Sequence, residues 1–466
     1  MGPNTQQPQR NPSIIFLIGV AVLVSISLSS CPFTQADDDS GENGNTIASG
    51  DYAVFAWNDL GMHCLNPTYD TLVILPPYNT IWVQVVQRGN PPQIVTDGIT
   101  VEYSLVGNTS SSDKRSYGQF WQYAEPLFGA TGLVEDTGLN LEDTDIHNGL
   151  AGTMVVKGDH FQADGIPVVP VGDDGTWDPY QQATITVKDA FGAVLAATMT
   201  TVPTSDEINC AECHGTGSID SAFQDIITSH DTAEGTDLAS AEPVLCASCH
   251  GSPALGSADE GTSGIYLSEA IHGFHSTTGA SCYDCHPGTV TQCSRSLAHT
   301  ASNGNCSSCH GEMADVASSI DSEGRIPWAD EPSCGSCHVA ASSATLTTVS
   351  AEISTIPGVN TGTELYRDSA GHGNVYCAAC HGSPHAMLPS REAKDNYQPI
   401  QYQGKSVTIG TCEVCHSTSR GGGFSEFFEE HGGTSGHTSS CMVCHTGFPS
   451  NASSASAPHS FGWSTR

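Results

Sequence analysis

The chain has 466 residues, of which 50 are Asp or Glu and only 14 are Lys or Arg, so its formal net charge is −36. This length favours two or three domains. Such a negative field excludes a nucleic-acid-binding function and favours cationic partners, metal ions or oxidised minerals, although high solubility is an equally simple explanation.

The first 30 residues are typical of an export signal. Arg10 precedes an apolar run of 17 residues, Ile14–Ser30, and a basic region followed by a hydrophobic one predicts a secretory signal peptide. The run leads into Leu28-Ser-Ser-Cys31, which resembles a bacterial lipobox, so we expect Cys31 to be lipidated and to start the mature chain. The alternative is a transmembrane anchor, since 17 residues lie at the lower limit for crossing a bilayer. Residues 31–50 are acidic and rich in Gly, Ser and Asn, which predicts a flexible tether.

Residues 51–205 have the pattern of β-strands. Apolar and polar residues alternate in 99–105 and 183–188, which is the period of a half-buried strand. The full set of expected strands is 52–57, 72–75, 81–86, 99–105, 183–188 and 193–202, the last two forming a hairpin. Four of the six tryptophans lie in this part and supply bulky apolar surface for an independent core. We therefore predict a β-sandwich of about seven strands.

Residues 206–466 contain eight copies of Cys-x-x-Cys-His, the attachment motif of c-type haem. The two cysteines form thioethers with the porphyrin, and the histidine is the proximal ligand of the iron. The cysteine pairs are Cys210 and Cys213, Cys246 and Cys249, Cys282 and Cys285, Cys306 and Cys309, Cys334 and Cys337, Cys377 and Cys380, Cys412 and Cys415, and Cys441 and Cys444. The proximal histidines are His214, His250, His286, His310, His338, His381, His416 and His445. We therefore predict eight c-type haems as cofactors.

The main alternative for these motifs is a set of zinc sites. Zinc needs two cysteine pairs at one four-coordinate site, but it does not require a histidine directly after every second cysteine. Residues 206–466 are rich in Gly, Ser and Ala and have no sustained periodicity, so their side chains cannot build a conventional core. We expect short helices and irregular segments wrapped around haems. The expected fold class is mixed: an all-β sandwich-like domain followed by a multihaem domain.

Each iron has a second axial position, and the number of histidines predicts what fills it. The haem region holds eight further histidines before its last few residues, namely His230, His272, His275, His299, His372, His385, His431 and His437. Ligation by two histidines at every haem is therefore the simplest expectation. His272 and His275 are three residues apart, so one helical turn could serve two neighbouring haems. His385 follows His381 too closely to reach the other face of the same haem, and we expect it to bind an adjacent one.

Three cysteines lie outside the haem motifs: Cys31, Cys64 and Cys293. In an oxidising compartment the last two could form a disulfide between the β domain and the haem domain, provided that they lie close together. Next to Cys64, His63 is either a ligand of a metal or haem or a hydrogen-bonded structural residue, and the structural role is the commoner one.

Two segments resemble a known family. Cys377-Ala-Ala-Cys-His-Gly-Ser-Pro-His385 through His416 resembles the large multihaem c-type cytochromes of metal-respiring bacteria. Trp57-Asn-Asp-Leu-Gly-Met-His-Cys64 resembles a β domain that accompanies some of them. The resemblance implies extracytoplasmic electron transfer, in some members through outer-membrane conduits or conductive filaments. It also implies a histidine where this chain has Lys405. If that position holds a ligand in the family, one haem here is ligated differently or is five-coordinate.

The expected function is electron transfer rather than catalysis, with single electrons passing from a respiratory donor to an external acceptor. The expected location is the outer membrane, as a lipoprotein facing the periplasm or the cell surface. Redox proteins, or extracellular metals and minerals, are the expected partners. One alternative is an octahaem reductase of a nitrogen or sulfur oxyanion, which needs an iron with an open face. Another is a conductive filament subunit, in which copies of the chain associate.

Overall fold

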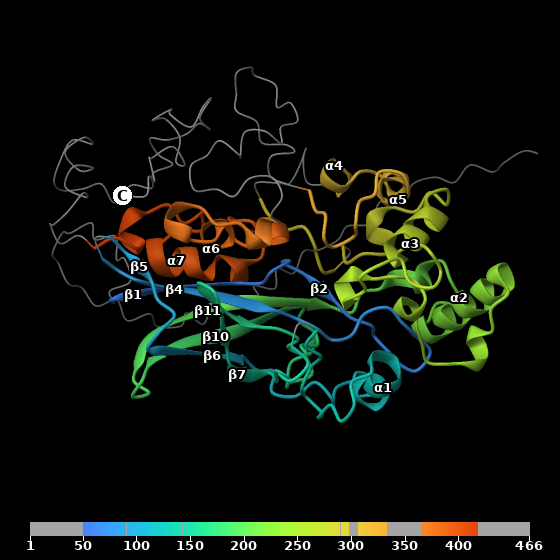
Figure 1. Cartoon of the computed structure of the whole chain (residues 1–466), viewed down its shortest axis with the longest axis horizontal. Coiled ribbons are helices and arrows are strands. Elements are labelled where there is room, and N and C mark those ends of the chain that lie inside the picture. Colours follow the sequence, from blue (N-terminus) through green and yellow to red (C-terminus); the bar gives the residue numbers. More distant parts are fainter. Residues whose placement is uncertain are drawn as a thin grey trace, which may run out of the picture. The chain divides into compact units, whose positions relative to one another are not determined.

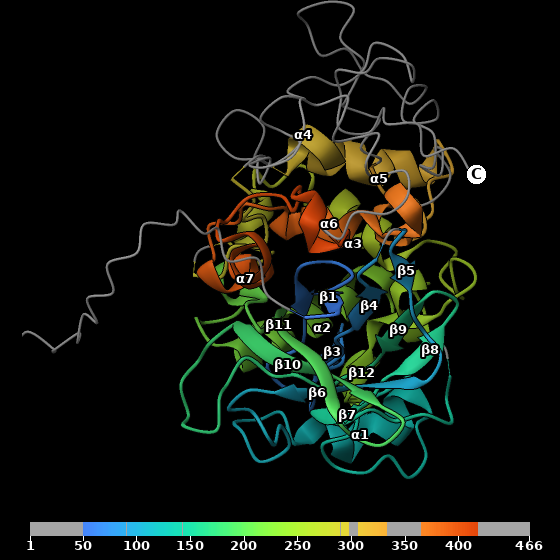
Figure 2. The same cartoon turned by 90° about the vertical axis from the view of Figure 1, so that its left-hand side faces the viewer.

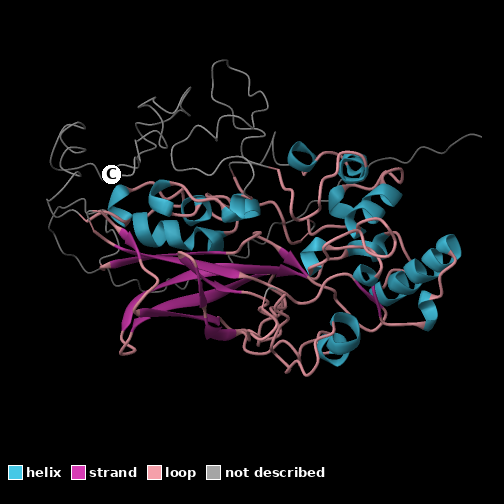
Figure 3. Cartoon of the chain, in the orientation of Figure 1, coloured by secondary structure: helices cyan, strands magenta, loops and turns pink. Residues whose placement is uncertain are grey.

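The computed structural model describes residues 50–417 apart from residues 90, 142, 289, 298–305 and 333–364. The predicted signal peptide, Cys31 and the haem motifs that begin at Cys334 and Cys441 lie outside the described residues. Strands gather in one part of the described chain, and short helices make up most of the rest (Figure 3). In these described ranges, none of the helices combines the length and the apolar character needed to cross a bilayer.

Two five-stranded sheets form the β part. The first contains β1 (Tyr52–Trp57), β4 (Ile81–Gln87), β9 (His160–Ala163) and β8 (Val155–Lys157) in this order, with β5 (Gln93–Ile94) also paired to β4. The second has the order β2 (His63–Cys64), β11 (Val194–Ser205), β10 (Tyr180–Asp189), β6 (Ile99–Leu105) and β7 (Ala151–Thr153). A separate parallel pair joins β3 (Leu72–Val73) to β12 (Val244–Leu245). The predicted strands and the hairpin between β10 and β11 are confirmed.

The two sheets pack face to face around one hydrophobic core. In β10 the residues Ala183, Ile185 and Val187 are fully buried, while the residues between them are only half-buried. They meet Val54 and Val83 of the first sheet in the same cluster. The alternation of apolar and polar residues thus turns one face of each strand into the core, which is why the second sheet was recognisable from its sequence.

The first sheet is covered on both faces. Its outer face packs against α6 (Cys377–His381) and α7 (Tyr397–Gln403), which lie over β1 and β4 in both views (Figures 1 and 2). The Tyr402 hydroxyl accepts a hydrogen bond from the Val54 amide at 2.8 Å and donates one to the Val54 carbonyl at 2.9 Å. β1 and β4 are near-continuous apolar runs, as expected for strands buried on both sides. The β part and the haem part therefore share a core.

The remaining helices are short. They are α1 (Gln119–Phe128), α2 (Ile219–Glu234), α3 (Leu267–His275), α4 (Ser307–His310) and α5 (Met313–Asp321). Single 3-10 turns away from the haem motifs are η2 (Leu238–Ser240), η4 (Pro253–Leu255), η8 (Tyr366–Asp368), η9 (His372–Asn374), η10 (Pro384–Ala386) and η11 (Ala393–Asn396). The 16-residue α2 was not predicted: the Ser218 side chain caps its first turn, and Gly235 ends it in the left-handed conformation.

Candidate functional site

Six Cys-x-x-Cys-His motifs lie in the described residues, and each forms a tight turn. The turns are η1 (Asn209–Glu212), η3 (Cys246–Ser248), η5 (Cys282–Asp284), α4, α6 and η12 (Cys412–Val414). At the first motif the His214 amide donates to the Cys210 carbonyl at 2.9 Å, and the second to fourth motifs repeat this bond at 2.9–3.0 Å. This turn keeps both cysteines and the histidine close together. We number the sites by motif order, so sites 1 to 4 end at His214, His250, His286 and His310, and sites 6 and 7 end at His381 and His416.

At sites 1 to 4, each proximal histidine faces a second histidine. The ring centres are 6.2 Å apart for His214 and His275, 6.3 Å for His250 and His230, 6.1 Å for His286 and His272, and 6.3 Å for His310 and His385. All four partners belong to the distal ligand candidates identified in the sequence. The rings are nearly perpendicular at sites 1 and 2, at 80° and 81°, and closer to parallel at sites 3 and 4, at 13° and 26°.

These separations fit an iron atom between the two rings. A metal–imidazole bond of about 2.0 Å, with the nitrogen roughly 1.1 Å from its ring centre, puts the two centres about 6.2 Å apart. In the described ranges, no group of three or more His, Cys, Asp or Glu side chains is arranged around a metal position. The donors thus come as two histidines, which suits haem iron, and not as the four ligands of a structural zinc site.

Most of these rings have their second nitrogen occupied. The Nδ1 atom lies 2.6 Å from the Ser268 carbonyl oxygen in His272, and 2.8 Å from the Ile271 carbonyl oxygen in His275. In His214 it lies 3.0 Å from a carboxylate oxygen of Asp225. Since these oxygens only accept, Nδ1 carries the proton and Nε2 is left for the metal. Such partners fix the tautomer and the ring orientation of a ligand.

The same arrangement holds at site 2. His230 and His250 each have Nδ1 3.0 Å from a hydroxyl, that of Thr236 and that of Ser263. The Thr236 hydroxyl already donates to Asp231, and the Ser263 hydroxyl donates to the Ile265 carbonyl oxygen. Both hydroxyls therefore accept from the imidazole, and Nε2 is again the free nitrogen.

Burial keeps the ligand groups uncharged. The pKa is lowered by burial in His272, His286, His310 and His385. Burial also raises the pKa of the Cys210 thiol to about 11 and that of the Cys246 thiol to about 12. Neutral imidazole is the form that binds iron, and a thioether has no proton to lose. These surroundings thus suit an attached haem.

Sites 6 and 7 dock on the outer face of the first sheet. Cys380 and Cys415 belong to one hydrophobic cluster with Phe55, Trp57 and Trp82. Near site 7, the Gly89 amide donates to the Cys415 carbonyl at 3.3 Å. The distal candidates His299, His431 and His437 and the side chain of His372 lie outside the described residues, as do the proximal ligands His338 and His445. Lys405 follows Gly404, which ends α7, and its side chain is half-buried.

His63 has a structural role. Its Nε2 atom lies 2.7 Å from a carboxylate oxygen of Asp59, and its ring stacks on Tyr78 with the ring centres 6.3 Å apart. Both His63 and Asp59 are buried. This agrees with the commoner of the two roles considered for this histidine.

Cys64 and Cys293 are both free thiols in the structure, so the disulfide considered from the sequence is not formed in it. They nevertheless lie near each other. Ser205, which pairs with Cys64 in the sheet, has its hydroxyl 3.1 Å from that of Thr291, two residues before Cys293. Burial raises the pKa of the Cys293 thiol to about 11 and that of Cys64 higher still, and the proximity of Cys293 adds to the latter. A disulfide between them stays a prediction.

We expect this bridge to form in the protein purified under oxidising conditions, because two neighbouring thiols in an exported protein meet an oxidant. Alkylation of the denatured protein should then label neither residue until a reductant is added. Peptide mass spectrometry would identify the linked peptides. Labelling of both cysteines without reductant would show that the bridge is absent, and the Cys293→Ser variant provides the unlinked control.

Comparison with known proteins gives one match. No curated protein and no solved structure is similar to this chain at a significant level. Residues 274–351 match the family model of cytochrome c3, and this stretch spans three of the Cys-x-x-Cys-His motifs. With the paired histidines of sites 1 to 4, this match supports the assignment of the chain as a multihaem c-type cytochrome, which carries electrons on covalently attached haem.

Proposed function

We propose that the protein relays single electrons along eight covalently attached haems, most of them bound by two histidines, in extracytoplasmic respiration. When bound, the haems supply one-electron redox chemistry. The chain supplies two neutral imidazoles at each of sites 1 to 4, with the ring tautomer set at most of them by a hydrogen bond to Nδ1. The observation that carries the proposal is the 6.1–6.3 Å separation of these four histidine pairs. Two axial ligands leave no open face for a substrate, which favours a carrier over a reductase.

Contacts between the sites support an order that differs from the order of the motifs. Sites 2 and 1 adjoin because Cys246 and Cys210 pack into the same hydrophobic cluster, around Phe223. Sites 1 and 3 adjoin because α3 carries His275 for the first and His272 for the third. The turns η1 and η5, which hold the cysteines of sites 1 and 3, also pack together. This part of the proposed path is therefore 2–1–3.

The path continues through sites 4, 6 and 7. Burial raises the pKa of Cys306 at site 4, and the neighbouring Cys282 thiol of site 3 raises it further. His385, the partner of His310 at site 4, follows the proximal ligand of site 6 by four residues, so one short loop joins these two sites. Cys380 and Cys415 bring sites 6 and 7 into one cluster. The proposed order is thus 2–1–3–4–6–7.

The proposed location and partners follow from the rest of the sequence. The lipobox-like Cys31 and its acidic tether suit an outer-membrane lipoprotein that faces the periplasm or the cell surface. The net charge of −36 suits cationic redox partners, or extracellular metal ions and minerals, as acceptors. Association of copies into a conductive filament is the structural variant of the same function, and electron microscopy of secreted material would detect it.

His385→Ala tests the ligand pairs. The variant should gain one five-coordinate haem, because His310 loses its partner across the iron. A new high-spin signal in magnetic resonance and the binding of about one additional carbon monoxide per reduced molecule would report it. His147→Ala is the matched control: this histidine of the β part lies 3.0 Å from the Gly138 carbonyl oxygen and faces no second histidine in the described residues.

Quantitation of haem in the unmodified protein should find eight per molecule. We expect two classes of low-spin signal, from the near-perpendicular and the near-parallel ring pairs. Unchanged spectra in His385→Ala would refute the pairing at site 4. A strong high-spin signal in the unmodified protein would instead favour the reductase.

A further inference from the structure

His385 differs from the other distal histidines in where its hydrogen-bond partner comes from. The Nδ1 partners of the other hydrogen-bonded ligands of sites 1 to 3 lie at most 13 residues away in the chain. His385 has Nδ1 2.8 Å from the Leu60 carbonyl oxygen, 325 residues away, in the turn that follows β1. A strand of the β domain thus leads directly to a candidate haem ligand.

The turn that presents Leu60 is rigid. Asn58 is buried, and its side-chain oxygen accepts from the amide of Leu60 at 3.2 Å and from that of Gly61 at 2.6 Å. The side-chain nitrogen of Asn58 donates to Asn79 at 2.7 Å and to the Thr80 carbonyl at 2.8 Å. Every polar atom of this side chain is therefore used to hold the turn on the first sheet.

Gly61 allows the turn to touch the ligand loop. Its φ is +81°, and a Cβ atom here would lie 3.1 Å from the backbone nitrogen of His385 and 3.1 Å from the Cβ of Ser383. Any larger residue would push the His385 loop away, in addition to the strain of a positive φ. The close approach is what brings the Leu60 carbonyl within hydrogen-bonding distance of the imidazole.

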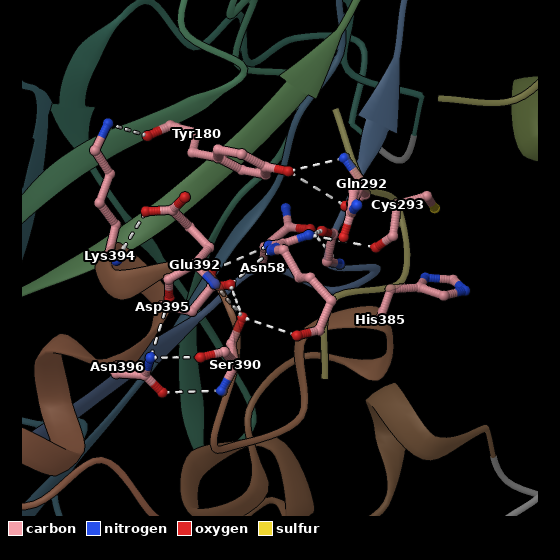
Figure 4. A network of polar contacts seen from close by, with 12 residues as sticks. Asn58, Tyr180, Gln292, Cys293, His385, Ser390, Glu392, Lys394, Asp395 and Asn396 are labelled. Atoms are coloured by element: carbon pink, nitrogen blue, oxygen red, sulfur yellow. Dashed lines mark hydrogen bonds and ion pairs between the residues drawn. The ribbon is translucent and has the colours of Figure 1, made fainter. Parts of the chain in front are cut away.

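A buried ion pair holds the other side of the loop. The Arg295 amide donates to the His385 carbonyl at 2.9 Å, and the Arg295 guanidinium donates to the Gly61 carbonyl at 2.5 Å. The same guanidinium binds both carboxylate oxygens of Asp395, at 2.6 and 3.0 Å. Figure 4 shows Asp395, Ser390 and Asn396 gathered in this network, with the imidazole of His385 pointing away from it. The backbone of His385 is thus anchored while its ring is free to face His310.

We infer that the turn Asn58–Gly61 of the β domain is a positioning element for the distal ligand of site 4. It holds the Nδ1 proton of His385 and the angle of the ring, so that Nε2 faces His310 across the iron position. A hydrogen bond to a backbone carbonyl also makes the imidazole a stronger ligand. This inference rests on the proposed ligation of site 4 by His310 and His385, and it gives a role to the Trp57–Cys64 segment.

Gly61→Ala tests this role, with Gly98→Ala as its matched control. Both glycines belong to the β domain and have positive φ, of +81° and +72°, but a Cβ atom at Gly98 would meet nothing within 4 Å. We expect the reduced Gly61→Ala protein to bind about one more carbon monoxide per molecule than the parent, and to gain a high-spin signal when oxidised. Gly98→Ala should change neither. Ser383→Gly added to Gly61→Ala removes one of the two close contacts and should restore part of the low-spin signal.

The outcomes separate this inference from the proposed function. If His385→Ala creates a carbon-monoxide-binding haem and folded Gly61→Ala does not, the turn has no positioning role. If His385→Ala itself creates none, the ligand pair at site 4 is wrong. Should Gly61→Ala fail to fold, Asn58→Ala takes its place, because it frees the turn without adding volume, and the same gain in carbon monoxide binding is expected. An unchanged spectrum in the folded Asn58→Ala protein would overturn the inference.

Discussion

Replacing Asp395 by alanine is expected to destabilise the protein by about 3–5 kcal/mol, because it leaves a buried charge without its partner. The side chain of Arg295 is 2% exposed and that of Asp395 is 6% exposed. The pair is joined by two hydrogen bonds, and Asp395 also accepts from the Ser390 hydroxyl at 2.6 Å. Alanine would thus remove all three bonds and strand the guanidinium in the interior. Chemical denaturation followed by far-ultraviolet circular dichroism would measure the change in the free energy of unfolding.

Glu102→Ala is the control for this loss. Glu102 pairs with Lys188 at 2.5 Å, but the two side chains are 39% and 29% exposed, so its removal should cost less than about 1 kcal/mol. The double variant Arg295→Met with Asp395→Leu should recover much of the loss, since well-packed apolar residues often replace a buried ion pair without penalty. Equal costs for Asp395→Ala and Glu102→Ala would contradict this account.

Removal of site 3 is expected to divide the relay into two parts. In the proposed order 2–1–3–4–6–7, site 3 alone connects sites 1 and 2 to site 4. The triple variant Cys282→Ala, Cys285→Ala and His286→Ala should therefore show two populations of haem in time-resolved reduction. Their rates should differ by more than about tenfold, the factor that ~1.4 kcal/mol of additional barrier produces. The parent protein should show one population.

Removal of site 2 is the matched control. The variant Cys246→Ala, Cys249→Ala and His250→Ala loses the same number of groups, but site 2 ends the proposed path among the described sites. Its remaining haems should equilibrate as one population. If both variants divide the haems, or neither does, the order is wrong. His272→Met retains the haem of site 3 and changes only its distal ligand, so it would show whether the effect depends on the loss of a whole haem.

The chemistry and many of the strands could be predicted from the sequence, because the signals for both are local. Cys-x-x-Cys-His contains in five residues everything that a haem attachment needs, so no tertiary information is required to identify it. The strands β6 and β10 alternate apolar and polar residues because each has one face in the core and one outside it. The helix α2 was missed, although Ser218 and Gly235 are capping signals at its ends.

By itself, the sequence determined which residues attach the haems and which histidines are available as second ligands, since each is a property of a short segment. Only the tertiary structure decided which histidine meets which. His272 and His275 lie three residues apart yet face His286 and His214, and His385 faces His310, a residue 75 positions earlier in the chain. It also decided that a turn after β1 holds His385 and that the first sheet is buried on both faces. The physical reason is that these contacts join segments hundreds of residues apart, and they form only when packing against a common core brings the segments together.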